Sequence, residues 1–247
     1  MAEFCSLQNK TVLVTGASSG IGQSVAILCS QMGATLILTG RNEERLAETL
    51  KKLSPGNHRM IPADLQREED ILTLVQNLPK LDGVVHSAGI GCISLCRDVT
   101  RKEYEDVFSV NFLAPVLLQA ELLRQKRINP SASLVFVASK AADIPSKGNS
   151  LYSASKAALI SYAKCLALEL SGRKIRVNCV LPTMVWTNFI YQAGMTASYH
   201  QEREAAYPLG RYGTPEDVAD LVLFLLSDNS SWMTGSALDI TGGAREL

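Results

Sequence analysis

Short apolar runs alternate with longer amphipathic stretches along the 247 residues of this chain. Residues 12–14 and 134–137 are apolar at every position, which is typical of strands covered on both faces of a parallel sheet. A further short strand is expected just ahead of Asp64. The predicted strands are 11–14, 35–38, 83–86, 134–137, 175–181 and 237–240.

Helical spacing of apolar residues fills the stretches between these runs. Gly33 and Gly172 are suited to end two of the helices. Because strands and helices alternate without a linker-like change in composition, we predict one α/β domain over residues 1–247. Its expected form is a Rossmann-type doubly wound parallel sheet of about seven strands with helices on both faces. The predicted helices are 21–32, 43–53, 67–78, 104–126, 150–170 and 215–226.

Residues 186–212 break this rhythm, because they are irregular in period and rich in aromatic side chains. Long irregular segments inside compact domains are commonly lids or binding loops, and a plain connection with its own short helices is the alternative. We expect a substrate lid. Its apolar side chains favour a hydrophobic carbonyl compound, although they are equally suited to subunit contacts: Trp186, Phe189, Ile190, Tyr191 and Met195.

Charge and composition narrow the function classes. Basic and acidic residues number 24 each, which argues against a dedicated binder of nucleic acid or anionic membrane. No stretch of eighteen apolar residues and no secretory signal is evident, so we expect a cytoplasmic protein without a membrane span. The six scattered cysteines are expected to be buried thiols rather than disulfides, and Cys92 and Cys96 lack the histidine partners of a zinc site. No protein-bound metal is predicted.

A glycine-rich turn follows the first predicted strand and opens a helix. Gly16, Gly20 and Gly22 permit a tight turn and a close backbone approach, while the helix N-terminus offers unpaired N–H groups to a pyrophosphate. The spacing differs from the commoner Gly-x-Gly-x-x-Gly, so an ordinary strand-to-helix turn is the alternative. Position and hydroxyl content favour a dinucleotide, held by Gly16, Ser18, Ser19, Gly20, Ile21 and Gly22.

The second predicted strand ends in Gly40-Arg41, where folds selective for NAD usually carry an acidic residue. Arg41 is suited to pair with a 2'-phosphate, so NADP(H) is favoured and NAD(H) is the alternative. A solvated position at the start of the helix is the other interpretation of Arg41. Asp64, followed by Leu65, is expected either to bind the adenine amine or to cap the next helix.

Tyr152 and Lys156 are four residues apart in a helical pattern, which places them on one face of the helix. A phenol near pKa 10 needs roughly 4 kcal/mol of phenolate stabilisation to act near neutral pH. Lys156 and the positive charge of an oxidised nicotinamide are expected to supply much of it. Ser139 ends a predicted strand at the edge where open α/β sheets bind ligands, and its hydroxyl is suited to hold a carbonyl oxygen.

Taken together, these residues resemble the short-chain dehydrogenase/reductase family from about Lys10 to the C-terminus. The resemblance implies a catalytic tetrad of Asn111, Ser139, Tyr152 and Lys156, in which Asn111 supports Lys156 through a water chain and Lys156 also holds the nicotinamide ribose. A buried structural amide is the alternative for Asn111. The matching residues are Thr15 to Gly22, Asp64, Ser87, Ala88, Gly89, Asn111, Ser139, Tyr152, Lys156 and Pro182 to Thr187, with Val185 and Thr187 expected beside the nicotinamide.

Three positions depart from the common family pattern. His86 stands where many members carry asparagine, Thr183 replaces the usual glycine, and Ser19 occupies a position where many NADP-using relatives carry arginine or lysine. These departures affect the support of the central sheet, the approach to the nicotinamide and the grip on a 2'-phosphate. Arg41 is therefore the one obvious phosphate partner in the sequence.

The resemblance is closest to 3-oxoacyl-[acyl-carrier-protein] reductases. It implies NADPH-dependent reduction of a ketone, a homotetramer or homodimer paired through residues 104–126 and 150–170, and an acyl carrier protein docked near Arg173, Lys126 and Arg127. Complementing the dipole of a helix end is the alternative role for Arg173. The alternative functions are a sugar, polyol or steroid alcohol dehydrogenase and a non-catalytic nucleotide-binding regulator.

Overall fold

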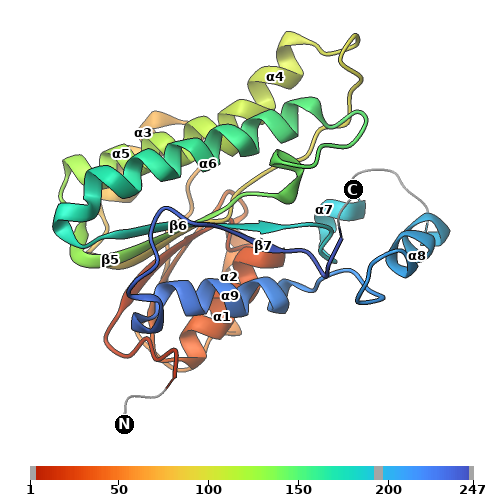
Figure 1. Ribbon diagram of the computed structural model, residues 1–247. Helices are drawn as coiled ribbons and strands as arrows, with labels where there is room; N and C mark the ends of the chain where they lie inside the picture. The colour runs from red at the N-terminus through yellow and green to blue at the C-terminus, as the bar shows by residue number, and fades with distance from the viewer. Residues whose placement is uncertain (1–3, 192–196, 245–247) are drawn as a thin grey trace.

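The computed structural model describes residues 4–191 and 197–244, and its centre is a seven-stranded parallel sheet (Figure 1). The strand order is β3-β2-β1-β4-β5-β6-β7, so successive strands are added toward one side of the sheet up to β3 and toward the other side from β4 onward. Such a switch point opens a crevice at the carboxyl edge of the sheet. The strands are β1 Thr11–Thr15, β2 Thr35–Thr39, β3 Arg59–Met60, β4 Leu81–His86, β5 Ile128–Val137, β6 Arg176–Pro182 and β7 Ala237–Ile240.

Helices cover both faces of the sheet, with α3 to α6 on one face and α1, α2 and α9 on the other (Figure 1). Two short helices, α7 and α8, follow β6 and lie to one side. The predicted doubly wound fold is confirmed. The helices are α1 Gly20–Gln31, α2 Glu43–Lys51, α3 Glu68–Gln76, α4 Arg101–Phe108, α5 Ala114–Arg124, α6 Ser150–Leu170, α7 Asn188–Tyr191, α8 Ala197–Ala205 and α9 Pro215–Leu226.

The core is divided into two layers by the sheet. Leu13 packs among the residues of α3, α5 and α6, whereas its neighbours Val12 and Val14 pack among those of α1 and α9. All three side chains are fully buried. Because successive side chains of a strand point to opposite faces, both faces require apolar residues, and this explains the continuous apolar runs.

The predicted helix 104–126 is present as a helical run from Arg101 to Arg124, but it is not a regular α-helix throughout. A capping box between Thr100 and Glu103 starts α4 three residues early, and a π-helical turn, Ser109–Leu113, separates α4 from α5. The stretch Arg101–Arg124 is 24 residues long and contains a window of 18 residues with a mean hydropathy of 1.4, enough by length and composition to cross a membrane. The stretch packs against α3 and α6, and 44% of the 18-residue window is buried inside the protein.

Two smaller expectations also need correction. Strand β5 starts at Ile128 rather than 134, because a bulge with left-handed Ser131 (φ 62°) carries polar residues into the strand. All six cysteines are free thiols, but Cys96 and Cys165 are exposed rather than buried. Gly33 (φ 91°) ends α1 as predicted, whereas the left-handed residue after α6 is Lys174 and not Gly172.

Candidate functional site

The turn between β1 and α1 is built on glycines that no other residue could replace. Gly16 and Gly20 have φ values of +65° and +54°. A Cβ on Gly16 would lie 2.9 Å from the backbone of Ala88, and one on Gly22 would lie 2.4 Å from the carbonyl oxygen of Gly16. The turn therefore packs directly against residues 87–88, and α1 starts closely behind it.

Thr15 joins this turn to the segment that follows β4. Its hydroxyl oxygen accepts hydrogen bonds from the backbone N–H groups of Ser87 (3.1 Å) and Ala88 (3.2 Å). Gly89, the next residue but one after Ser87, lies where a Cβ would be 3.3 Å from both Asn111 Oδ1 and Lys156 Nζ. The residues expected at the two halves of a dinucleotide site are thus brought to one edge of the sheet.

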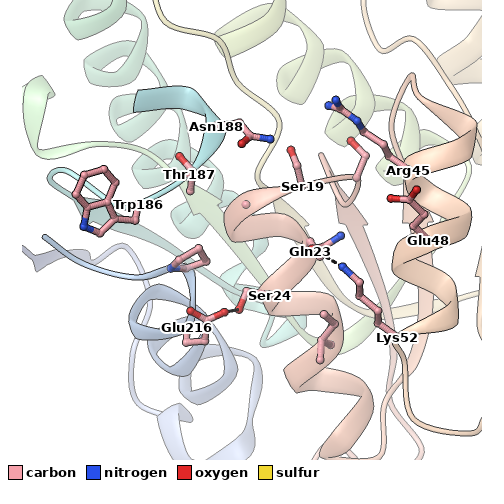
Figure 2. Close-up of a pocket in the computed structure, with 14 residues that line it drawn as sticks. Ser19, Gln23, Ser24, Arg45, Glu48, Lys52, Trp186, Thr187, Asn188 and Glu216 are labelled. Atoms are coloured by element: carbon pink, nitrogen blue, oxygen red, sulfur yellow. Dashed lines mark hydrogen bonds between the residues drawn. The ribbon is translucent and has the colours of Figure 1, made fainter. Parts of the chain in front are cut away.

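A pocket of about 400 Å³ opens at the N-terminus of α1 (Figure 2). Hydroxyl groups of Ser18, Ser19 and Thr187 line it, and Ser19 makes no side-chain cap bond with the helix. A Cβ on Gly20 would lie 3.1 Å from Thr187 Cγ2, so Thr187 stands directly over the turn. Positive-φ glycines, hydroxyl groups and a helix N-terminus at one pocket fit the phosphates of a dinucleotide.

Two basic side chains line the pocket that the sequence did not lead us to expect there. Arg45 and Lys52 line it, and in Figure 2 the Arg45 side chain reaches from α2 toward the glycine turn. Arg41 is exposed and lies outside the pocket lining. Arg45 lies in the first turn of α2, which starts just after the end of β2, and this position near the carboxyl edge of the sheet is the signal that would have identified it.

Asp64 lies beside the end of β2, because the Ala63 N–H bonds to the Gly40 carbonyl oxygen at 3.1 Å. Its carboxylate accepts the Gln66 N–H at 3.1 Å, whereas the N-cap residue of α3 is Arg67. The helix-capping alternative for Asp64 is therefore wrong. The Leu65 side chain is buried in the core, so only its backbone remains to contact a cofactor.

Tyr152 and Lys156 occupy the first two turns of α6, as the spacing predicted. The Tyr152 phenol is hydrogen-bonded to the Ser139 side chain, which follows β5. Lys156 is 4% exposed; its Nζ donates to the Val137 carbonyl oxygen at 2.9 Å and lies 5.7 Å from the centre of the Tyr152 ring. Phenol, hydroxyl and amine therefore meet at the carboxyl edge of the sheet.

Burial acts on both ionisable groups. It raises the pKa of the Tyr152 phenol, which the hydrogen bond with Ser139 lowers in part. It lowers the pKa of Lys156 from 10.5 to about 8. The net direction for the pKa of Tyr152 is opposite to the lowering that we expected from Lys156, because burial of the phenol outweighs the hydrogen bond with Ser139.

Asn111 lies in the π-helical turn and is fully buried. Its Oδ1 accepts the Ile90 N–H at 2.8 Å, and its Nδ2 donates to the Ile90 carbonyl oxygen (2.9 Å) and to Ser155 Oγ (3.1 Å). Ser155 in turn donates to the Tyr152 carbonyl oxygen at 2.7 Å. Asn111 thus ties the segment after β4 to the first turn of α6, which agrees with the structural-amide alternative.

Contacts in the structure explain two of the three positions that depart from the common family pattern, His86 and Thr183. His86 is buried, stacks on Phe136 with ring centres 4.4 Å apart, and its Nε2 is 3.2 Å from Gln119 Oε1. Burial lowers the pKa of His86 to about 4, so the ring is a neutral packing group under the β4 edge. Thr183 Oγ1 donates to the Thr241 carbonyl oxygen at 3.3 Å, which directs this side chain toward the end of β7.

The segment 182–187 runs along the same edge. The Pro182 carbonyl oxygen accepts the Ser139 hydroxyl at 3.4 Å. Val185 forms an isolated bridge with Gly213, and its carbonyl oxygen lies 3.3 Å from Thr187 Oγ1. The residues expected beside the nicotinamide are therefore placed between Ser139 and the glycine turn.

The apolar side chains of the presumed lid, residues 186–212, do not form one continuous surface. Ile190 is buried and packs with Tyr207 and Tyr212 in a small cluster that also contacts Trp186. The Trp186 Nε1–H donates to Glu204 Oε1 at 2.7 Å. Met195 lies outside the described residues, as do the contacts of the Tyr191 side chain.

Phe189 is not a member of this cluster. Its ring centre is 5.7 Å from that of Tyr152, with the ring planes 52° apart. Among the described residues of the segment, Phe189 therefore makes an aromatic contact with Tyr152.

The basic residues expected to dock a carrier protein lie at the amino edge of the sheet. Arg127 donates to the Leu78 carbonyl oxygen (2.6 Å), and Arg173 donates to that of Ile128 (2.5 Å). Arg173 follows the 21 residues of α6, whose length at about 1.5 Å per residue separates it from Tyr152 by about 30 Å. Within one chain, these guanidinium groups and the phenol occupy opposite edges of the sheet.

In the part of the chain that is described, no group of three metal-ligating side chains occurs.

Comparison with known proteins agrees with this arrangement. A family profile described as "Enoyl-(Acyl carrier protein) reductase" matches residues 16–245. A 3-oxoacyl-[acyl-carrier-protein] reductase FabG of Rickettsia felis is 34% identical over 241 residues, covering 96% of this chain and 97% of that protein. An L-xylulose reductase of Caenorhabditis elegans is also 34% identical, covering 95% of each chain.

Solved structures show the same likeness. The crystal structure of a dehydrogenase/reductase from Sinorhizobium meliloti 1021 superposes with a TM-score of 0.88 at 35% identity, covering 98% of this chain and 97% of the other. A protein described as belonging to the short chain dehydrogenase/reductase family gives a TM-score of 0.86 at 31% identity and covers 96% of this chain.

Proposed function

The chain belongs to the short-chain dehydrogenase/reductase family of oxidoreductases, and we propose that it uses NADPH to reduce a hydrophobic ketone to a secondary alcohol. A 3-oxoacyl compound is the substrate class favoured by the FabG relative. The observation that carries the proposal is the hydrogen-bonded pair of Ser139 and Tyr152 with the buried Lys156 amine one helical turn away. A cytoplasmic location accords with this role.

In this mechanism the chain's own residues manage the proton. When bound, the reduced nicotinamide supplies the hydride. Ser139 holds the carbonyl oxygen, and Tyr152 donates its phenolic proton to that oxygen. The cationic Lys156 amine stabilises the phenolate left behind and holds the nicotinamide ribose, while Asn111 fixes the helix turn that carries both groups.

The residues around the glycine turn are assigned to the cofactor. Gly16, Ser18, Ser19, Gly20, Ile21 and Gly22 hold the phosphates, and Ser87, Ala88 and Gly89 form the wall across from them. Asp64 and the backbone of Leu65 face the adenine. Arg41 and Arg45 meet the 2'-phosphate, and Pro182, Val185 and Thr187 hold the carboxamide end.

Replacing Tyr152 by phenylalanine tests the mechanism. The ring is retained and the proton donor is lost, so we expect kcat for ketone reduction to fall by about 10³-fold while the Kd for NADPH stays within about twofold. Tyr162→Phe, on the same helix, is the matched control. A Tyr152→Phe enzyme with wild-type turnover would contradict the proposed proton transfer.

A second candidate function rests on the L-xylulose reductase relative, which is as similar as the FabG protein. It makes a sugar or polyol the substrate of the same chemistry. A panel of 3-oxoacyl thioesters, hydrophobic ketones, sugars and polyols, followed at the nicotinamide absorbance, separates the two candidates. Turnover of none of these compounds would favour the non-catalytic regulator instead.

Assembly is part of the proposal. We infer a homotetramer or homodimer paired through the helical run from α4 to α5 and through α6, which expose Leu113 in the π-helical turn (48%) and Leu168 in α6 (78%). Analytical ultracentrifugation of wild type and Leu168→Glu tests this assembly.

An acyl carrier protein is a candidate partner of the chain. Titration of the carrier protein into wild type and Arg173→Glu tests this interaction.

A further inference from the structure

One aromatic side chain of the presumed lid reaches the catalytic phenol. Phe189, at the second position of α7, has its ring centre 5.7 Å from that of Tyr152. The ring is 39% exposed, so it lies at the mouth of the site and not in the core. A carbonyl compound that approaches Tyr152 from this side shares its space with the ring.

The tip of the Phe189 ring lies against Gly91. A Cβ on Gly91 would lie 2.9 Å from Phe189 Cζ and 3.3 Å from Cε1. Gly91 is not among the residues with positive φ, so its backbone conformation does not require glycine. The Phe189 ring tip instead occupies the volume that a side chain at position 91 would fill, so a larger residue there would displace the ring.

The segment that carries Gly91 is held in place from the side of α6. The Ser94 N–H donates to the Gly148 carbonyl oxygen at 2.8 Å, and Ser94 forms an isolated bridge with Asn149, the residue before α6. Ile93 on this segment is 59% exposed and Leu95 is 37% exposed, so the segment adds an apolar rim beside Tyr152. Gly91 is therefore a fixed wall, and the Phe189 ring is the adjustable one.

We propose that Phe189 and Gly91 form a size filter that sets which substituent is accepted beside the carbonyl carbon. The substrate has a small, unbranched group on the flank that faces Phe189 and an apolar chain along the rim of Ile93 and Leu95. Carbonyl compounds with a ring or branch on the Phe189 flank are excluded. This inference rests on the proposed function, because it takes Tyr152 as the proton donor.

The test compares two ketoesters that differ only on one flank of the carbonyl. Ethyl acetoacetate carries a methyl group there and ethyl benzoylacetate carries a phenyl group. Phe189→Ala is expected to raise the ratio of kcat/KM for the phenyl ester over the methyl ester by about tenfold or more. Phe189→Tyr retains the ring and is expected to leave that ratio within about twofold, as is Leu209→Ala at an exposed position in the same part of the chain.

Gly91→Ala supplies the decisive step. Its new methyl group would push the tip of the Phe189 ring aside. When Gly91→Ala is introduced into the wild-type chain, we therefore expect the phenyl-to-methyl ratio of kcat/KM to rise about threefold. When it is introduced into Phe189→Ala, we expect the same ratio to change less than twofold. Multiplicative effects of the two substitutions, an unchanged ratio in Phe189→Ala, or failure of both esters to bind or react in all the variants would overturn the filter. NADPH titration of the same variants tests the proposed function separately, because neither residue lines the nucleotide pocket.

Discussion

The carboxyl edge of the sheet and the segment Trp186–Tyr212 are built in different ways. At the edge, the side chains of Lys156 and Asn111 are buried and bonded to backbone groups of neighbouring elements. Ile190 and Tyr212 of the segment instead pack into a small cluster of their own. The segment meets the edge at Thr187, which lies over the glycine turn, and at Phe189, which lies beside Tyr152. In the proposed function, proton transfer belongs to the edge and selection of the carbonyl compound to the segment.

Replacement of Lys156 is the strongest way to test the edge. Its pKa of about 8 lies below its ordinary value, so the amine is cationic below pH 8 and neutral above it. We expect kcat/KM for reduction to fall as pH rises through about 8, because the neutral amine no longer stabilises the phenolate. Lys156→Ala is expected to lower kcat/KM by about 10²–10³-fold at pH 7 and to abolish this limb of the profile.

Lys164→Ala, an exposed position on the same helix, should retain both the rate and the profile of the wild type. A wild-type profile that is flat from pH 7 to 10 would contradict the role of a Lys156 cation.

A moderate effect is expected at the nucleotide end of the edge. A guanidinium bonded to a phosphate contributes about 1.5–3 kcal/mol, so Arg41→Ala and Arg45→Ala should each raise the Kd for NADPH about tenfold or more. The Kd for NADH should stay within about twofold, since NADH lacks the 2'-phosphate. Fluorescence titration of both nucleotides measures this, with Arg101→Ala as a control on the far face of the sheet.

Equal losses for NADPH and NADH would mean that the two arginines act on the shape of the pocket. No loss in Arg45→Ala would leave Arg41 as the phosphate partner and would remove Arg45 from the site.

The smallest effect is expected inside the segment. Ile190 is 3% exposed, and Ile190→Val removes one methylene, which costs about 1 kcal/mol of stability. Thermal unfolding monitored by circular dichroism should show this loss, and Leu209→Ala at 72% exposure should show almost none. If the segment packs separately, the pH limb attributed to Lys156 should keep its midpoint. A shifted midpoint would show that the cluster and the edge are coupled.

Much of the fold was predictable because strands that are buried on both faces of the sheet have continuous apolar runs in the sequence. Strands β1, β2, β4 and β6 and the order of helices follow from apolar runs and helical spacing. The π-helical turn did not, because an insertion within five residues hardly disturbs the period of a long helix. This turn places Asn111 in the core, so the position of a predicted residue depended on a feature that periodicity could not show.

Some features of the candidate site could likewise be predicted from the sequence, and others could not. The spacing of Tyr152 and Lys156 and the glycines of the turn were predictable, because helix geometry and backbone sterics act over a few residues. Arg45 was missed because its approach to the pocket depends on how α2 packs beside α1.

By itself, the sequence determined the glycine turn after β1 and the placement of a tyrosine and a lysine one helical turn apart. Only the tertiary structure decided the surroundings of these groups. Burial raises the pKa of Tyr152 and lowers that of Lys156. The extent of burial depends on every element that packs around the two side chains. Distant residues also decided which aromatic side chain faces the phenol, because Phe189 meets Gly91, 98 positions away, through the folding of the whole chain.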